Sequence, residues 1–543
     1  MARELIADVS LITSDPDSYF ETSWGWPTSQ AVYDQAISDF MFGVHNLHNR
    51  IEANEHLGLA LGLVKSDLLK DISYFMAAWI DVISARQSGL TVKYADDQFI
   101  FDAVERNVYP DVSPTLIQRI GSRKGLKKWV KNKAAYMIHK RKNSQALRSS
   151  KNAVFSTSLN PLGKQIAPLG TSALRLTTTD VTMSRPTFDS PTKLIAEVAE
   201  QVEVLATSAL GRSGFVASGE LKTYIQRIGN QHLSYGWFDV NRRDLLAPRT
   251  EQATLITGTG SGYSSRLLSL QFLRRGNDVV RTSHGGDAPL FKDVLRPTIE
   301  YPFCSTYVVN GPKSATLVEQ SFEENLESKQ AYFPSSVVAV GSRLHRSVPR
   351  PPNQHPPRRI AVISASFNRM YRITPFQKVH DVVYLDWHRR LLKELRDMGY
   401  DTVAKRHPKG HISNIPVFGD VCSEELIAAP MADIFEDVDA FVIDFPASAF
   451  MEAICTEKPV VLIDMGIRPM HVSVREQMVN SIAVVRASFD ENNRVVVDVD
   501  EIQKGLETPV NIEERSRFVR DYLTQESAAS GSIFDNLPGS RKT

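Results

Sequence analysis

The 543-residue sequence predicts an α/β fold of two Rossmann-like domains that face a cleft, with a helical addition at the N-terminus. Amphipathic helical patterns fill residues 1–150, and strands alternate with helices in residues 151–348. The same alternation restarts at residue 360, after a proline-rich stretch. Because alternating strands and helices favour a parallel sheet covered by helices, two such runs favour two domains.

Composition is typical of an ordinary globular protein. Apolar residues make up 42% and charged residues 23%, and the formal net charge is +1. This balance creates no global attraction to nucleic acid, so we expect no nucleic-acid partner. The three cysteines, Cys304, Cys422 and Cys455, form no C-x-x-C pair, which argues against a disulfide framework and against structural zinc.

The first residues, MARELIADVSLITSDPD, carry acidic side chains where an export signal has its apolar core. The best apolar run, residues 57–64, is far shorter than the roughly 18 residues of a membrane span. We therefore expect a cytoplasmic protein. Residues 122–143 interleave basic side chains with Trp129 and Tyr136, a pattern that suits peripheral contact with the inner face of the cell membrane, although a solvated basic helix is the simpler interpretation.

The mainly helical accessory segment, residues 1–150, shows apolar residues at helical spacing, for example in residues 29–57. The N-terminal Rossmann-like domain, residues 151–348, begins with a short strand, turn and helix in residues 152–167. A helix that follows the strand ATLIT is closed by Gly276. Further strands are expected in NDVVRTSHGG, STYVV and SSVVAVGSR.

Residues 349–359 hold five prolines, which exclude helix and favour an extended interdomain linker. The C-terminal Rossmann-like domain, residues 360–525, alternates strands such as RIAVI, DAFVIDF and KPVVLID with helices. Residues 526–543 read as a flexible tail. Ligands of open parallel sheets bind beyond the carboxyl ends of the strands, so we expect the chemistry in the loops that follow strands.

The stretch DTVAKRHPKGH, residues 401–411, places His407 at the end of a strand that Pro408 terminates. Lys405, together with Arg406, Lys409 and His411, raises the local positive potential. This pattern indicates a binding site for a phosphate-bearing ligand. The alternative is a capping histidine among solvated lysines.

The stretch DAFVIDFPASAFMEAICTEKPVVLID, residues 439–464, predicts a second part of this site. Pro446 suits the first position of a helix, and Ser448 then lies in the first turn, where free N–H groups and its hydroxyl can bind phosphate. Glu452, one turn later, can accept hydrogen bonds from ribose hydroxyls. Simple capping by Ser448 and a surface role for Glu452 are the alternatives.

Two further strand ends carry candidate residues. Arg369, in SASFNRMYR after the first strand of the C-terminal domain, can reach into the cleft. In the N-terminal domain, NDVVRTSHGGDAPLF places His284 before two glycines and Asp287 three positions later. A histidine and a carboxylate on such a turn suit general-base or nucleophilic catalysis, whereas a turn capped by Asp287 is the alternative.

The stretch TGTGSGYSSR, residues 257–266, is a glycine-rich loop between a strand and a helix. It lacks the G-x-G-x-x-G spacing, the later acidic residue and the Walker lysine, so a dinucleotide or P-loop site is not expected. We interpret it as a flexible loop on the acceptor side of the cleft, with Gly260, Tyr263 and Ser264 as its candidate contacts.

The order of these features resembles the CDP-glycerol glycerophosphotransferases of teichoic-acid synthesis: HGG followed by PLF, VVAVGSR before the linker, KRHP, VIDFPASAFMEA and KPVVLID. It is also similar to bacterial transferases of CMP-activated Kdo and sialic acid, which share the His-Pro motif and a serine at a helix start. Both groups have the GT-B fold, whose C-terminal domain holds a nucleotide donor and whose N-terminal domain holds the acceptor. The resemblance covers residues 250–470.

The resemblance implies that His407 and Ser448 hold the donor phosphate and that His284 or Asp287 acts on the reacting centre. The glycerophosphotransferases read Trp-His-Gly-Thr-Pro and Asp-Tyr-Ser-Ser, whereas this chain has Asp287 in its glycine turn and Ala447 before a lone serine. With one hydroxyl fewer, a CMP-linked donor fits better than a CDP-linked one. Asp287 is then either the base of an inverting reaction or the nucleophile of a retaining one.

The sequence thus predicts a GT-B glycosyltransferase that uses a cytidine-nucleotide donor, preferably a CMP-linked ulosonic acid such as Kdo. The expected product is a bacterial surface polysaccharide, lipopolysaccharide O-antigen or capsule, and the expected partners are the donor and a glycan or lipid-linked glycan acceptor. Neither cofactor nor metal is required, because the chain offers no Asp-x-Asp cluster and basic groups can offset the leaving phosphate. The alternatives are transfer of glycerol phosphate from CDP-glycerol and a non-catalytic GT-B-like scaffold or glycan-binding subunit.

Overall fold

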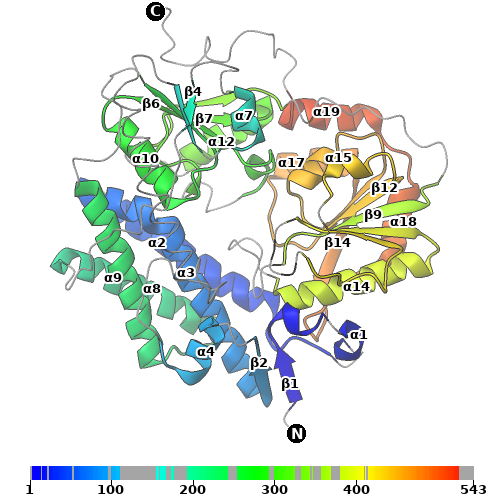
Figure 1. The fold of residues 1–543 in the computed structure, drawn as a ribbon, viewed down its shortest axis with the longest axis horizontal. Helices are drawn as coiled ribbons and strands as arrows, with labels where there is room; N and C mark the ends of the chain where they lie inside the picture. Colours follow the sequence, from blue (N-terminus) through cyan, green and yellow to red (C-terminus); the bar gives the residue numbers. More distant parts are fainter. Residues whose placement is uncertain are drawn as a thin grey trace, which may run out of the picture.

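A computed structural model shows two parallel sheets and a group of long helices (Figure 1). The basic segment 122–143, the linker residues 349–355 and the tail 526–543 lie outside the residues that the structure describes. The described residues are 3–13, 15–20, 24–51, 54–95, 99–109, 154–157, 159–166, 173–175, 192–241, 253–292, 299–324, 332–342, 345, 356–367, 379–408, 410, 412, 414–427 and 429–524.

The first Rossmann-like domain is built on a six-stranded parallel sheet of order β4-β3-β5-β6-β7-β8. The strand order reverses between β3 and β5, which is the position where open parallel sheets bind ligands. Strand β7 is buried along its whole length because helices pack on the sheet. The elements are β3 (Val154–Thr157), α7 (Pro161–Ile166), β4 (Ala173–Arg175), β5 (Thr254–Thr257), α10 (Tyr263–Leu273), β6 (Asp278–Thr282), η3 (Ala288–Leu290), β7 (Thr306–Val309), α12 (Pro312–Glu324) and β8 (Ser336–Ala339).

The second Rossmann-like domain has a seven-stranded sheet of order β11-β10-β9-β12-β13-β14-β15, parallel except for its last pair. Its strand order reverses between β9 and β12. Its elements are β9 (Arg359–Ile363), α14 (Asp381–Asp397), β10 (Asp401–Lys405), β11 (Glu424–Leu426), α15 (Met431–Ile434), β12 (Ala440–Ile443), α16 (Ser448–Ala453), β13 (Val460–Asp464), α17 (Val472–Ser481), β14 (Ala483–Phe489), β15 (Val495–Val497), α18 (Val499–Glu507) and α19 (Ile512–Tyr522).

The helical addition draws on two parts of the chain. Helices α8 and α9, which lie between β4 and β5 in sequence, pack on the N-terminal helices α2 and α3 (Figure 1). Gly236 of α9 permits a close approach, since an added Cβ would lie 2.4 Å from the Ala60 carbonyl oxygen of α3. The elements are β1 (Arg3–Ile6), η1 (Val9–Leu11), α1 (Pro16–Tyr19), α2 (Gln30–Ile51), α3 (Glu55–Gln87), β2 (Leu90–Lys93), α4 (Phe99–Arg106), α8 (Lys193–Arg212) and α9 (Gly219–Asn241).

Residues 193–241 fall inside the segment predicted as the first Rossmann-like domain, yet they contact the N-terminal helices. Their helices contain 20 and 23 residues, whereas the strands of the adjacent sheet contain three to five. An apolar stripe on a long helix is buried better by another long helix than by a narrow sheet. Helix length therefore accounts for this packing.

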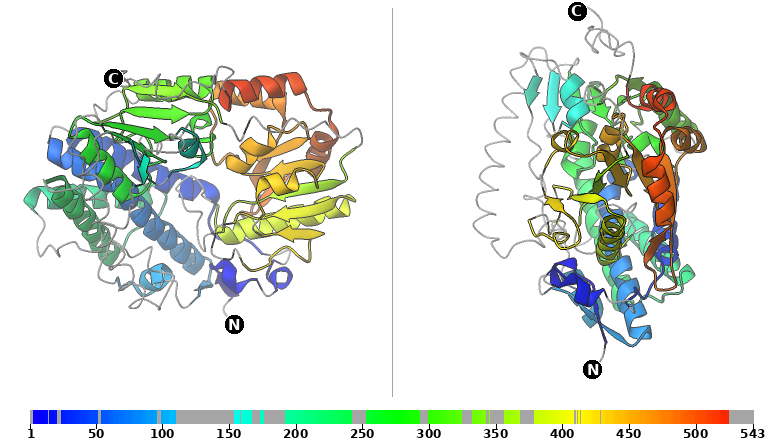
Figure 2. Two further views of the ribbon diagram at one scale, coloured as in Figure 1. Left: turned by 45° about the horizontal axis from the view of Figure 1, so that its top comes forward. Right: turned by 90° about the vertical axis from the view of Figure 1, so that its right-hand side faces the viewer.

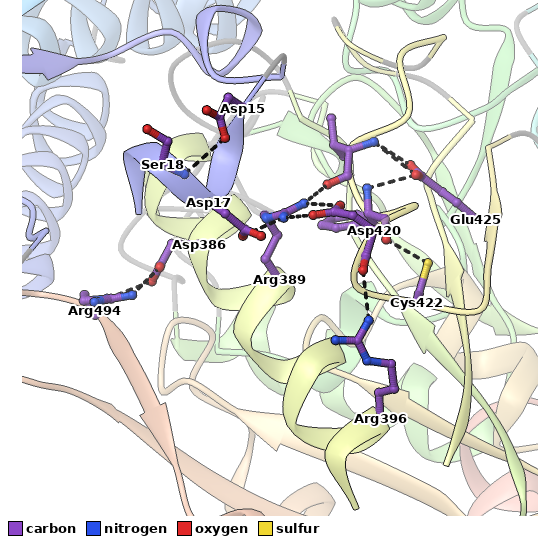
Figure 3. Close-up of polar contacts among 12 residues, drawn as sticks. Asp15, Asp17, Ser18, Asp386, Arg389, Arg396, Asp420, Cys422, Glu425 and Arg494 are labelled. Carbon is purple, nitrogen blue, oxygen red and sulfur yellow. Dashed lines mark hydrogen bonds and ion pairs between the residues drawn. The ribbon is translucent and has the colours of Figure 1, made fainter. Parts of the chain in front are cut away.

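The N-terminal segment docks on the second Rossmann-like domain (Figure 3). Arg389 of α14, whose side chain is only 3% exposed, donates to Asp17 at 2.7 Å and to the Val417 carbonyl at 2.6 Å, and it also pairs with Asp420. The indole ring of Trp26 stacks on His380 with 4.0 Å between ring centroids. The helical addition is thereby joined to the C-terminal domain.

The last described helix, α19, packs on α12 of the first domain and on α17 of the second (Figure 2). The Ser314 hydroxyl of α12 donates to the Tyr522 carbonyl at 3.0 Å, and the Ser342 N–H donates to the Leu523 carbonyl at 3.1 Å. Gly311 lies against the backbone of Tyr522. The chain thus returns from its C-terminal domain to contact its N-terminal one.

The predicted fold class is confirmed: an α/β protein with two Rossmann-like sheets and an N-terminal helical addition. Strands were predicted correctly where a short apolar run ends at a polar turn, as in β5, β10 and β12. In the ranges that the structure describes, none of the helices combines the length and apolar character needed to cross a membrane.

Gly311→Ala should lower the midpoint of thermal unfolding, because its Cβ would lie 2.3 Å from the Tyr522 carbonyl carbon. Overpacking of this kind costs roughly 1–3 kcal/mol. The control is Gly211→Ala in α8, where an added Cβ meets nothing within 4 Å and stability should not fall. Equal midpoints for the two variants would show that α19 does not depend on this contact.

His380 should make the protein less stable in acid. The Nδ1 atom of His380 accepts a hydrogen bond from the Val382 N–H at 3.2 Å. Burial lowers the pKa of His380 from 6.5 to about 3, although the Asp81 carboxylate lies 4.0 Å from its Nε2. Because the unfolded chain binds this proton first, stability is lost as the pH falls from about 6.5 toward 3, by roughly 1.4 kcal/mol per unit of pKa difference.

His380→Asn keeps a helix-capping acceptor but does not titrate, so its stability should fall less over this pH range. Urea unfolding at a series of pH values measures the two slopes. Parallel slopes for the variant and the parent would contradict the assignment to His380.

Candidate active site

The loops that follow β6 and β13 join the two Rossmann-like domains. Phe291 and Met470 form an antiparallel bridge. The Lys292 N–H donates to the Pro469 carbonyl at 2.8 Å, and the His471 N–H donates to the Leu290 carbonyl at 3.1 Å. We call this contact, residues 290–292 with 469–471, the interdomain bridge. Side chains from both domains meet beside it.

Asp287 and Arg468 form a buried ion pair between the domains. Arg468 Nη1 donates to Asp287 Oδ2 and to the Pro446 carbonyl, each at 3.1 Å. The two residues are only 4% and 7% exposed. The guanidinium carbon lies 3.8 Å from the ring centroid of Phe291, which adds a cation–π contact. Asp287 stands at the N-cap position of η3 but makes no capping hydrogen bond there, and its side chain instead pairs with the second domain.

Gly285 and Gly286 allow this contact because they have positive φ angles of 69° and 84°. An added Cβ on Gly285 would lie 2.4 Å from Ser448 Oγ and 2.7 Å from Asp287 Oδ1. On Gly286 it would lie 2.3 Å from Asn310 Nδ2. The glycine turn therefore lets Ser448 of the second domain lie close to Asp287 of the first.

His284 is exposed, unlike the buried Asp287 next to Arg468. Asn160, in the loop after β3, holds the start of the turn by donating to the carbonyls of Ser283 at 2.7 Å and Thr282 at 3.3 Å. The structure therefore places His284 and Asp287 in different environments on one turn. Any joint action requires His284 to act from the solvent side.

Helix α16 begins at Ser448, with Ala447 as its N-cap. The prediction that Pro446 takes the first helical position is wrong, because the helix starts at Ser448 and Pro446 precedes the extended N-cap residue Ala447. The Pro446 carbonyl instead accepts from Arg468. Helix α16 has only six residues, so its backbone dipole is weak. We therefore expect the Ser448 hydroxyl and the Arg468 guanidinium to contribute more to the binding of an anion than the dipole does.

Lys405, the last residue of β10, and Glu452 of α16 influence each other electrostatically. Burial lowers the pKa of Lys405, and the Glu452 carboxylate opposes this shift. Burial also raises the pKa of Glu452, and Lys405 opposes that shift in turn. Lys405 Nζ donates to the Arg406 carbonyl at 3.2 Å. The pair is a titratable cluster beside the predicted phosphate position, where an added anion would favour the charged lysine.

His407 is exposed two residues beyond the end of β10, at the predicted strand end. Arg406 adds less to the local potential than the sequence suggested, because its buried guanidinium pairs with Glu425 at 3.0 Å and donates to the Ile412 carbonyl at 2.5 Å. The remaining basic candidates, Arg369, Lys409 and His411, lie outside the described residues.

A buried carboxylate, Asp444, sets the position of the loop before α16. Tyr384 and Trp387 of α14 donate to it at 2.8 and 3.0 Å. His388 Nε2 lies 2.8 Å from its Oδ2. Sequence reasoning placed Asp444 at the end of a strand but assigned it no role. The spacing of Tyr384, Trp387 and His388 puts three hydrogen-bond donors on one face of a helix, and this pattern could have predicted a buried acceptor beside that face.

The glycine-rich loop follows β5, where the order of the first sheet reverses. Gly260 has a φ of 66°, and its carbonyl accepts from Arg266 at 3.2 Å. The Tyr263 hydroxyl donates to Asp239 of α9 at 2.6 Å, and Ser264 is half-buried. The loop is thus attached to the helical addition. Within the described ranges, no group of three or more His, Cys, Asp and Glu side chains is placed to hold a metal ion.

Comparisons with known proteins give limited similarity. No family model and no curated protein matches the chain. Among solved structures, the glycosyltransferase SnogD from Streptomyces nogalater is 13% identical, with a TM-score of 0.28 over 70% of this chain and 98% of that one. The glycosyltransferase SsfS6 from Streptomyces sp. SF2575 is 10% identical, with a TM-score of 0.29 over 69% of this chain and 95% of that one. The glycotransferase of kitacinnamycin is 14% identical, with a TM-score of 0.32 over 71% of this chain and 99% of that one. At these scores the similarities establish neither activity nor substrate for this chain.

Gly285→Ala should disrupt the site, since its methyl group would collide with Ser448 Oγ and Asp287 Oδ1 in a backbone conformation that alanine rarely adopts. We expect weaker binding of phosphate-bearing ligands in calorimetry and a lower unfolding midpoint. Gly262→Ala is the matched control, because its Cβ meets nothing within 4 Å. Unchanged ligand binding by Gly285→Ala would place the ligand away from this turn.

Proposed function

We propose that the protein is a glycosyltransferase that uses a cytidine-nucleotide donor, with a CMP-linked ulosonic acid such as Kdo preferred. One observation carries the proposal: Asp287 of the first domain pairs with Arg468 of the second, and Ser448 of the second domain lies close to the same glycine turn. A group-transfer enzyme with donor and acceptor on different domains needs reactive groups from both domains at the reacting centre. The product proposed is a bacterial surface polysaccharide, O-antigen or capsule, made in the cytoplasm.

The donor would occupy the second domain, beyond the carboxyl ends of β9 and β12. Ser448 and His407 then hydrogen-bond its phosphate, and Lys405 supplies positive charge. Glu452, next to Lys405, takes the nucleoside hydroxyls. These groups stabilise the negative charge that develops on the CMP phosphate when the glycosidic bond to it breaks, without a metal ion.

The acceptor would occupy the first domain, near the glycine-rich loop after β5, with Gly260, Tyr263 and Ser264 at its edge. In an inverting reaction, the acceptor oxygen attacks the anomeric carbon, CMP leaves with the bonding electrons, and Asp287 takes the acceptor proton. His284 assists from the exposed side of the turn. In a retaining reaction, Asp287 instead forms the glycosyl-enzyme bond.

Incubation with CMP-Kdo, CDP-glycerol or UDP-sugars and glycan acceptors tests the proposal by the mass that the acceptor gains. We expect addition of the ulosonic acid with release of CMP. Asp287→Asn should lower turnover about 10²–10⁴-fold, because the proton acceptor is lost. Asp39→Asn in α2 is the control with the same charge change; its carboxylate pairs with Arg212 of α8 at 2.7 Å, away from the site, and turnover should persist.

Three outcomes would contradict parts of the proposal. Addition of glycerol phosphate would favour the CDP-glycerol reaction. Tighter binding of UMP and UDP than of CMP and CDP in calorimetry would refute the cytidine donor. Full activity in cells after Asp287→Asn and His284→Ala would favour a non-catalytic scaffold.

A further inference from the structure

We propose that Arg468 is the cation that binds the donor phosphate, and that the Asp287 carboxylate occupies this cation until the phosphate displaces it. The inference rests on the proposed function only in taking a phosphate-bearing donor as the ligand. Arg468 was not among the residues suggested by the sequence. Its place in the loop after β13, at the carboxyl edge of the second sheet, puts it at the predicted donor site.

The guanidinium of Arg468 is held in one position from several sides. Nη1 donates to Asp287 and to the Pro446 carbonyl, and the rings of Phe291 and Phe445 lie 3.8 and 5.2 Å from the guanidinium carbon. The Pro446 bond and the ring contacts do not depend on Asp287. They would keep the cation oriented after the carboxylate departs.

A phosphate and a carboxylate compete for such a cation. The carboxylate is planar and the phosphate is tetrahedral, but both present negatively charged oxygen atoms that accept charge-assisted hydrogen bonds from arginine. Two anions on one buried guanidinium would repel each other strongly in a medium of low dielectric constant. The phosphate can therefore bind Arg468 only as Asp287 leaves it.

A cavity that borders Arg468 on the side of the second domain is too small to admit a phosphate. The cavity beside Arg468, lined by Pro446, Asp464 and Met470 among others, has a volume of about 20 Å³, enough for about one water molecule. Across Gly285, no Cβ separates Asp287 Oδ1 from Ser448 Oγ. Rotation of the glycine turn would thus withdraw Asp287 and expose both the Arg468 guanidinium and the Ser448 hydroxyl to the same phosphate.

The exchange couples donor binding to the availability of the proposed base. One ion pair breaks and another forms, with no covalent change and no net transfer of charge. Before the donor binds, the Asp287 carboxylate is engaged in its hydrogen bond from Arg468. After the donor binds, Asp287 is released beside the anomeric carbon. The acceptor is then deprotonated only when a donor is present.

The test is calorimetric titration of the full chain with CMP, UMP and inorganic phosphate. Asp287→Asn removes the competing charge and leaves Arg468 a buried cation without its anion, so all three ligands should bind about tenfold more tightly. Arg468→Gln should weaken all three about tenfold. A residue that acts only as a base would leave ligand affinity unchanged when replaced by asparagine.

Asp464→Asn is the matched control, since it removes a carboxylate that borders the same cavity but pairs with Arg475. The smaller gain in ligand affinity expected for Asp464→Asn measures the effect of removing one negative charge near the cavity. If Asp287→Asn gains no more affinity than Asp464→Asn, or if Arg468→Gln binds as the parent does, the inference is overturned. Circular dichroism verifies folding.

Arg468→Lys provides a second variant that keeps the buried charge in case Arg468→Gln does not fold. Lysine cannot contact Asp287 and Pro446 with the same planar group, so phosphate affinity should still fall. Parent-like affinity in this variant would also overturn the inference. The proposed function is judged separately, by the preference for CMP over UMP in the parent protein, which the exchange does not affect.

Discussion

The interdomain bridge is the contact on which the rest of the candidate site depends. Its two backbone hydrogen bonds, between residues 290–292 and 469–471, bring the loops of the two sheets into register. Only in this register does the Asp287 carboxylate reach Arg468 in a buried position. An exposed pair of this kind contributes little, whereas a buried one is costly to break, so the site and the domain interface are energetically linked.

Three further contacts restrain how the sheets sit relative to each other. The helical addition reaches the first sheet through Arg266 of α10, which donates to Asp67 and to the Leu63 carbonyl. It reaches the second through Asp17 and Arg389. Helix α19, which follows the second sheet in sequence, packs on α12 of the first domain. Contacts between domains are usually small and permit motion, so these contacts restrain the two sheets against moving apart.

Much of the candidate site followed from one rule, that ligands of parallel sheets bind at the carboxyl ends of strands. Asp287 and Ser448 were identified because they follow buried apolar runs, and the structure places them after β6 and β12. Arg468 was missed because a single arginine after a strand has no distinguishing pattern. Arg406 was misjudged because adjacent basic residues look alike in sequence, although its guanidinium is buried against Glu425.

The sequence by itself determined the local features: strand-helix alternation and glycines at turns that need positive φ. These depend on neighbouring residues, so a short window contains the whole signal. Only the tertiary structure decided which long helices pair, and that Asp287 meets Arg468, 181 positions away. Such contacts depend on the packing of whole domains, where burial and geometry select one partner from many similar side chains.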